Sequence, residues 1–321
     1  MSTPLATHLR LPPTAAPQDF VISRAQLLAG GLSPRQIEYR LGSRSWQAIL
    51  PGVYLAQASG PSRRQMMIAA LLYAGADSAI DDVDACRFHG IRAAVPDDRL
   101  VHVVAPYGSP ARSRGFVVVR RTTAPIRVVR TERLRYLEPA AAVIAAARRV
   151  RSNRGVLALL SDAVQRRVVT YEELIRAHVQ GPPRNAAAAD AALGDIGAGI
   201  RSAPEADFRL LAESSTVLPR LLYNRLLRLP TGNVISPDAL AEDAGLVHET
   251  NGRTAHSRED LFDDMQERHS VMTDAGLVVL HSAPRRLRQH GREVIARFER
   301  LYLANSGKGL PPGVVLLPLA A

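Results

Sequence analysis

The sequence predicts a mixed fold that combines α/β and α+β structure in three successive parts. Helical periodicity alternates with short β-prone runs, residues typical of helix caps precede several helical stretches, and glycine and proline interrupt the pattern between the parts. We expect domains at residues 1–60, 61–184 and 185–304, followed by a loosely docked tail at 305–321. The 321 residues, of which 46% are apolar, suffice for two or three domains.

The composition indicates a polyanionic partner. The chain has 41 basic and 30 acidic residues, a net charge of +11, and nucleic acid is the usual partner of so basic a protein. No apolar run approaches the ~20 residues that cross a membrane, and proline and threonine interrupt the first 18 residues where a signal peptide would be apolar. We therefore expect a cytoplasmic protein with no membrane partner. The single cysteine, Cys86, excludes an internal disulfide and a cysteine-rich zinc site.

The first part predicts two short helices joined by a turn. Ser23 is placed to cap a helix over residues 24–29, which Gly30-Gly31 would end. The run Ser33-Pro34-Arg35-Gln36 then combines a cap, a first-turn proline and a glutamine three residues after the cap. This capping box predicts the start of a second helix.

The second helix has an apolar face and a polar, basic face. Ile37 and Leu41 share the inward face, and β-prone runs at residues 46–50 and 53–55 flank the turn Pro51-Gly52. Two helices followed by a hairpin wing can place a recognition helix in a DNA major groove, although such helices also occur in bundles that bind nothing. The side chains that we expect at double-stranded DNA are Arg35, Gln36, Tyr39, Arg40 and Arg44.

Several of these residues also fit a known family. The matching motifs are Val21-Ile22-Ser23-Arg24, Gly31-Leu32-Ser33, Tyr39-Arg40, Trp46 and Pro51-Gly52-Val53-Tyr54. Together they resemble the N-terminal winged helix-turn-helix of AbiEi-type antitoxins from abortive-infection systems. The resemblance implies binding to DNA, typically at a promoter, and a cognate toxin as a further partner.

The middle part predicts an α+β region followed by a helical connector. Helical stretches are expected at residues 64–73, 82–88, 137–149, 155–166 and 171–178, and strands at 100–105 and 116–121. Residues 84–90 resemble the middle region of AbiEi-like proteins, without any chemistry attached to them. The connector is rich in arginine, which we interpret as a solvated face, with phosphate contacts as the alternative.

The third part contains carboxylates at a spacing that suits a metal-dependent nuclease. A helix that begins near Glu205 would supply one, while the β-prone runs 233–235 and 245–247 would carry Asp238 and Glu249 at their ends. Mg²⁺ prefers hard oxygen ligands and binds through one or two carboxylates while keeping waters. Asp238 and Glu249 are therefore the candidate metal ligands, and surface positions without chemistry are the alternative.

The passage from residue 202 to 280 resembles the very-short-patch-repair-like branch of the PD-(D/E)XK endonuclease fold. The matching motifs are Leu218-Pro219-Arg220, Tyr223-Asn224, Ala244-Gly245-Leu246-Val247-His248-Glu249, Asn251-Gly252-Arg253, Asp263-Asp264, Arg268 and Gly276-Leu277-Val278-Val279-Leu280. The resemblance implies a restriction-endonuclease-like α/β module that cleaves DNA with Mg²⁺.

Two positions depart from that family. Its members read Glu-x-Asp-Gly where this chain reads Glu249-Thr250-Asn251-Gly252, and the lysine of the general signature has no counterpart, because the chain's single lysine is Lys308. An amide binds a divalent metal more weakly than a carboxylate does and cannot act as a base, whereas His256 titrates near neutrality. The candidate catalytic residues are Glu205, Asp238, Glu249 and His256.

These features predict a DNA-binding regulator that resembles AbiEi antitoxins and carries a degenerate nuclease-fold domain. The first alternative is an active Mg²⁺-dependent DNA endonuclease guided by the N-terminal module. The second is an interaction protein whose C-terminal module binds a partner toxin.

Overall fold

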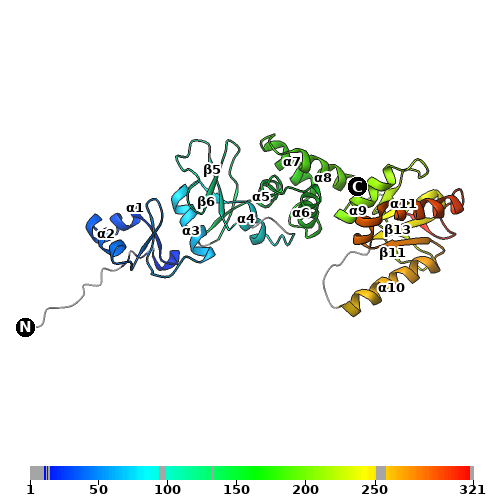
Figure 1. Ribbon diagram of the computed structural model, residues 1–321, viewed down its shortest axis with the longest axis horizontal. Helices are drawn as coiled ribbons and strands as arrows, with labels where there is room; N and C mark the ends of the chain where they lie inside the picture. The colour runs from blue at the N-terminus through cyan, green and yellow to red at the C-terminus, as the bar shows by residue number, and fades with distance from the viewer. Residues whose placement is uncertain are drawn as a thin grey trace, which may run out of the picture. The chain divides into compact units, whose positions relative to one another are not determined.

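The computed structural model describes residues 11, 13, 15–93, 99–131, 133–250 and 258–318, without the side chains of 258–265 (Figure 1). Helices and several sheets alternate along it, which confirms the predicted mixed α/β class. The chain divides into two compact units, Met1–Ala189 and Asp190–Ala321, with the boundary inside α8 (Ala187–Gly197). Within the described ranges, none of the helices has both the length and the apolar character needed to span a membrane.

The first unit begins with a small helical module closed by a three-stranded sheet. Its elements are η1 (Ala16–Gln18), β1 (Val21–Ser23), α1 (Arg24–Ala29), α2 (Pro34–Gly42), β2 (Gln47–Leu50) and β3 (Val53–Leu55). Both predicted caps form, because Ser23 and Ser33 each make a capping box with the glutamine three residues later. The antiparallel strand order is β1-β3-β2, and Ile37 and Trp46 are buried beneath the sheet and helices.

Helix α3 (Arg63–Ala74) joins this module to the middle region. It packs against β1, β2 and β3 of this module and also against β4 (Ala79–Ile80) and β5 (Val101–Pro106) of the next sheet. The Gln65 side chain donates a hydrogen bond to the carbonyl of Asp19 at 2.9 Å. Residues 15–60 and the middle region therefore belong to one unit.

The middle region is a mixed five-stranded sheet followed by helices. Its remaining elements are β4 (Ala79–Ile80), α4 (Asp82–Phe88), β5 (Val101–Pro106), β6 (Val117–Thr122), β7 (Val128–Arg130), β8 (Arg135–Leu137), α5 (Pro139–Ala147), α6 (Asn153–Gln165) and α7 (Tyr171–Gln180). The strand order is β6-β5-β4-β8-β7. The helix predicted from residue 137 starts at Pro139, because Leu137 pairs with Val128 at the end of β8.

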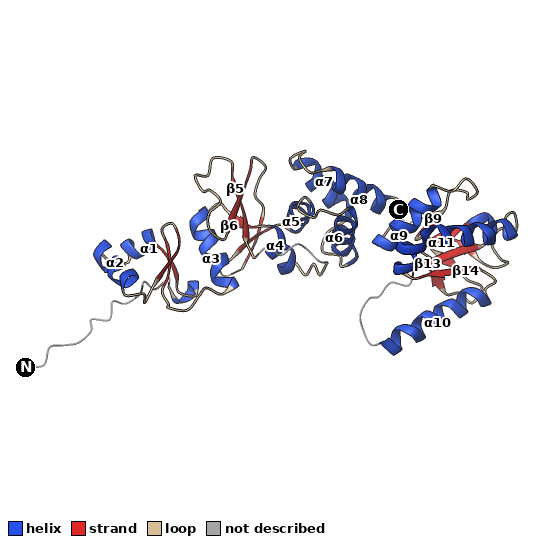
Figure 2. Ribbon diagram, in the orientation of Figure 1, coloured by secondary structure: helices blue, strands red, loops and turns tan. Residues whose placement is uncertain are grey.

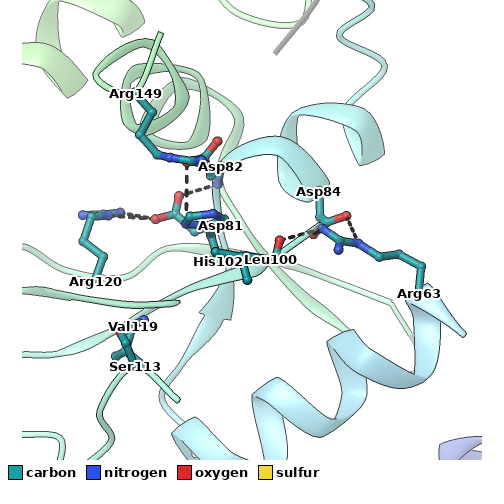
Figure 3. Close-up of polar contacts among 10 residues, drawn as sticks. All are labelled: Arg63, Asp81, Asp82, Asp84, Leu100, His102, Ser113, Val119, Arg120 and Arg149. Atoms are coloured by element: carbon teal, nitrogen blue, oxygen red, sulfur yellow. Dashed lines mark hydrogen bonds and ion pairs between the residues drawn. The ribbon is translucent and has the colours of Figure 1, made fainter. Parts of the chain in front are cut away.

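Three carboxylates at the start of α4 each pair with an arginine from a different part of the unit (Figure 3). The pairs are Asp81 with Arg120 of β6 at 2.7 Å, Asp82 with Arg149 after α5 at 2.7 Å, and Asp84 with Arg63 of α3 at 2.6 Å. Asp82 is 2% exposed and has a left-handed φ of 57°. Burial raises the pKa of Asp82, while the hydrogen bond and charge of Arg149 oppose this rise.

The second unit places its helices on both faces of a sheet. Its elements are α9 (Ala203–Glu213), β9 (Leu222–Tyr223), β10 (Leu227–Arg228), β11 (Val234–Ile235), β12 (Ala239–Ala241), η2 (Glu242–Ala244), β13 (Leu246–Thr250), α10 (Arg258–Asp274), β14 (Val278–Ser282), α11 (Pro284–Asn305) and β15 (Val315–Leu316). Figure 2 shows α10 and α11 on opposite sides of β13 and β14, which are parallel strands of the sheet β14-β13-β12-β9. Phe208 and Phe298 fill the core beneath α9 and α11, and Met272 fills the core beneath α10.

The expectation of a loosely docked tail is wrong for the described residues up to 318. Strand β15 pairs antiparallel with β10, which forms a second sheet of order β11-β10-β15. The Leu317 amide donates to the Leu226 carbonyl and the Gly309 amide to the Asp243 carbonyl, both at 2.9 Å. Val314 is buried in the core beneath α10, so apolar packing reinforces the strand pairing.

We expect Asp84→Asn to lower the free energy of unfolding of the first unit by about 2–3 kcal/mol, because it leaves Arg63 without its buried counter-charge. Urea denaturation followed by circular dichroism measures this loss. Arg64→Gln breaks the more exposed pair with Asp19 and should cost no more than about 1 kcal/mol. Equal losses in the two variants would show that the α4 pair has no special structural role.

Candidate functional site

Polar residues gather at one end of the sheet β14-β13-β12-β9. The carboxyl ends of the parallel strands β13 and β14 lie there, and so does the start of the antiparallel strand β12. Glu249 is the penultimate residue of β13, Asp238 directly precedes β12, and Asn224 directly follows β9. The pairs Ala239–His248 and Ala239–Tyr223 fix this alignment across three strands. The carboxyl ends of strands are a common place for ligand sites in α/β sheets.

Glu249 lies on the face of the sheet that α10 covers. The residue is 7% exposed, and the Arg268 guanidinium of α10 donates to its Oε1 at 3.1 Å and to the carbonyl of Ser236 at 2.7 Å. Burial, followed by repulsion from Asp238, raises the pKa of Glu249 to about 7, although Arg268 lowers it. Glu249 is thus a carboxyl group that exchanges its proton near neutral pH.

Thr250 holds the Asp238 side chain at this end of the sheet. The Thr250 amide and hydroxyl both donate to Asp238 Oδ2, at 2.6 and 2.5 Å. The expectation that the run 233–235 carries Asp238 at its end is wrong. That run forms β11, which pairs with β10 in the other sheet. Asp238 instead lies directly before β12.

Glu205 reaches the same place from the first turn of α9. It is 7% exposed, and its Oε2 accepts hydrogen bonds from the Asn224 side chain at 2.6 Å and the Arg201 amide at 2.9 Å. Asn224 adopts a left-handed φ of 50°, which asparagine tolerates. Its backbone N–H donates a hydrogen bond to the backbone carbonyl of Asp238 at 3.3 Å. Burial, then the charge of Asp238, raises the pKa of Glu205.

The structure therefore brings Glu205, Asp238 and Glu249 within electrostatic reach of one another. Asp238 raises the pKa of both glutamates, and Glu205 adds to the rise at Glu249. The sequence spacing predicted such a group of carboxylates, and the catalytic and metal-binding roles of its members stay predictions. The fourth candidate, His256, and the divergent Asn251 lie outside the described residues.

Two histidines next to these carboxylates were missed by the sequence reasoning. His281 of β14 stands beside Glu249 in the parallel register, and its Nε2 lies 2.9 Å from Nδ1 of His269 on α10. Burial, then the electrostatic influence of His269 and Arg268, lowers the pKa of His281. The signal was present in the sequence, because aligning the two β-prone runs that begin at residues 246 and 278 places His281 opposite Glu249.

His248, by contrast, is a core residue. It is completely buried, stacks on Phe208 with ring centroids 3.5 Å apart, and its Nε2 lies 2.7 Å from the Ser282 hydroxyl. Burial lowers the pKa of His248 to about 3, so the ring is neutral at physiological pH. We assign it a packing role.

The described side chains at this site provide few ligands for Mg²⁺. Within the described part of the chain, no three His, Cys, Asp or Glu side chains are arranged to hold a metal ion. The second oxygens of Asp238 and Glu249 make no hydrogen bond to any described residue. The set fits an ion bound through two carboxylates and several waters, which is a common mode for Mg²⁺.

The predicted DNA-binding side chains lie on or next to α2. They differ in exposure and in whether they contact other residues of the module. Arg35, Tyr39 and Arg44 are exposed, Tyr39 to 76%. Gln36 uses its side-chain oxygen to accept the Ser33 amide at 2.8 Å, as part of the capping box. The Arg40 guanidinium lies over the Trp46 ring, 4.9 Å from its centroid. Gln36 and Arg40 thus support the module, and the first three remain available to a partner.

Comparisons with known proteins add little to this geometry. No protein-family model and no curated protein matches the chain. Among solved structures it is similar to the RV2827C protein from Mycobacterium tuberculosis, with 18% identity, a TM-score of 0.39, and coverage of 65% of this chain and 85% of that one. A TM-score at this level supports no inference about fold or function.

The raised pKa of Glu249 predicts a pH-dependent stability of the second unit. A carboxyl group with a folded-state pKa of about 7 stabilises the fold at low pH, and this contribution disappears as the pH rises through 7. Between pH 5 and 8 the wild type should therefore lose about 1–3 kcal/mol more unfolding free energy than Glu249→Gln, which cannot ionise.

Urea titrations at several pH values measure this difference. Glu213→Gln changes a carboxylate that is half exposed in its ion pair with Arg209, and it should keep the wild-type pH dependence. Parallel pH profiles for the wild type and Glu249→Gln would refute the assignment.

Proposed function

We propose that this chain is a DNA-binding protein whose helix α2 and β2–β3 hairpin contact duplex DNA. The observation that carries the proposal is the outward face of α2, where Arg35 and Tyr39 are exposed one turn apart while Ile37 anchors the opposite face in the core. The order helix, turn, helix and hairpin matches the arrangement in which a second helix enters a major groove. An exposed tyrosine beside arginines also suits contacts to sugar and phosphate.

The distribution of charge supports this assignment. The first unit has 26 basic and 13 acidic residues, whereas the second has 15 basic and 17 acidic residues. The positive excess of the whole chain thus resides in the unit that contains α2. Contacts between cationic side chains and phosphates supply most of the sequence-independent affinity for DNA.

We favour a regulatory role, as in the AbiEi-type antitoxins that the N-terminal residues resemble. In the second unit, Arg268 forms an ion pair with Glu249, and Thr250 donates hydrogen bonds to one oxygen of Asp238. The acidic residue and lysine of the resembling nuclease family are also missing from the sequence. These features favour binding over cleavage, and a cognate toxin belongs to the proposal as a partner.

Arg35→Ala should weaken binding to a preferred duplex by about 1–3 kcal/mol if Arg35 contacts a base edge, and should reduce sequence preference. Gel-shift titrations at two salt concentrations measure both effects. Arg184→Ala removes an exposed arginine of the same unit outside the module and should leave sequence preference intact. The α2 assignment fails if the two variants bind alike.

A metal-dependent endonuclease is the second candidate function, and the convergence of Glu205, Asp238 and Glu249 favours it. Bound Mg²⁺ would supply a Lewis acid for a phosphate oxygen. Asp238 and Glu249 would hold the ion, while Glu205 positions Asn224 and, through it, the Asp238 backbone. The pair formed by His281 and His269, in which Nε2 of His281 lies 2.9 Å from Nδ1 of His269, stands beside Glu249 and would be the route for proton transfer.

Under this second candidate, Mg²⁺ should raise the melting temperature of the wild type, because a cation relieves repulsion among the carboxylates. Asn251→Asp should increase that shift and produce plasmid nicking, and Glu249→Gln should abolish both. Thermal shift and plasmid assays with and without Mg²⁺ distinguish the functions. Stabilisation without nicking in all variants would favour the regulator, and the absence of any shift would indicate a purely structural cluster.

A further inference from the structure

Helix α11 carries a strongly basic face on a unit that is otherwise acidic. Its exposed arginines are Arg285, Arg286, Arg288, Arg292, Arg297 and Arg300, which we call the α11 basic face. The helix contains two acidic residues, Glu293 and Glu299. Apart from this helix, the second unit has 9 basic and 15 acidic residues. The charge is therefore a local feature of α11 and does not reflect the composition of the unit.

Most of the α11 basic face has no counter-charge among the residues that the structure describes. Within the described ranges, four of its arginines make no hydrogen bond or ion pair, namely Arg288, Arg292, Arg297 and Arg300. Of the two acidic residues, Glu293 faces Arg286 at 3.6 Å and His290 at 3.1 Å, and Glu299 accepts the Ser215 hydroxyl at 2.5 Å. Neither acidic residue neutralises the four free arginines.

Packing does not require these arginines. The buried positions of α11 are Leu287, Val294, Ile295 and Phe298, which contact the core beneath α9 and α11. Arg285 and Arg288 lie three residues apart before the kink at His290, and Arg297 and Arg300 lie three residues apart after it. Like charges at this spacing on a helix destabilise it by a few tenths of a kcal/mol per pair. A bound polyanion offsets this repulsion.

We propose that the α11 basic face binds the phosphate backbone of duplex DNA, as a contact separate from α2. Helix α11 has a kink at His290, where the backbone is not helical; the 15 residues after it span ~22 Å, and duplex DNA presents a phosphate charge about every 1.7 Å of its axis. Several arginines can therefore meet phosphates at once. Because α11 begins directly after β14, its first turns lie at the end of the sheet that carries Glu249 and His281. The inference rests on DNA as the partner and not on the role of α2.

The test compares two charge-reversal variants of the full chain. Arg288→Glu with Arg292→Glu alters the α11 basic face. Arg220→Glu with Arg228→Glu makes the same change at two exposed arginines elsewhere in the second unit, and serves as the matched control. Circular dichroism and thermal melting verify that both variants fold.

Fluorescence anisotropy with a duplex of about 40 base pairs, titrated at several salt concentrations, gives affinity and salt dependence. We expect the α11 variant to lose at least about tenfold in affinity near 0.1 M salt, and the slope of log K against log salt to become shallower by about 2. The control should keep a slope close to that of the wild type.

The outcomes separate this inference from the proposed function. If Arg35→Ala has no effect while the α11 variant weakens binding, the role of α2 is wrong and the α11 inference stands. Equal losses in the α11 and control variants, unchanged binding by the α11 variant, or no DNA binding by the wild type would each overturn the inference. Tighter binding to an RNA duplex or to polyglutamate, lost in the α11 variant, would assign the face to a different polyanion.

Discussion

The first unit depends on opposite charges that meet at the start of α4. Asp81, Asp82 and Asp84 lie in or directly before one turn of helix, and each draws an arginine from a segment distant in sequence. An unpaired carboxylate buried this deeply would cost several kcal/mol. Sheet, α3 and the end of α5 must therefore be in place together, which ties the scaffold that carries α2 to the five-stranded sheet.

In the second unit, the described buried carboxylates have fewer arginine partners. Glu205 and Glu249 are as buried as Asp84, yet among the described residues only Arg268 supplies a cation to the group, and it pairs with Glu249. Burial, followed by repulsion from Asp238, raises the pKa of both glutamates. Perturbed carboxyl groups of this kind cluster at functional sites, although structural networks produce them as well. This contrast between the two units makes the end of the sheet β14-β13-β12-β9 the stronger candidate for chemistry.

Local features of the fold could be predicted from the sequence, and features set by distant pairing could not. Ser23 and Ser33 form their capping boxes as expected, since a cap involves residues three positions apart. The prediction that Asp238 follows the strand at residues 233–235 was wrong. Strands β11 and β12 look alike as short apolar runs, and only tertiary pairing assigns them to different sheets. His281 was missed because the two β-prone runs place it opposite Glu249 only when they are aligned as parallel neighbours, and a helix separates them in the sequence.

Strand β15 has a consequence for the order in which the chain folds during synthesis. The central strand β10 has one neighbour nearby in sequence, β11, and another that lies almost ninety residues later. The sheet β11-β10-β15 therefore stays open at one edge until residues 315–316 have left the ribosome. The first unit, which ends at Ala189, can fold well before that moment. A nascent chain would then present α2 in its native form while the carboxylate end of the second unit is still unfinished.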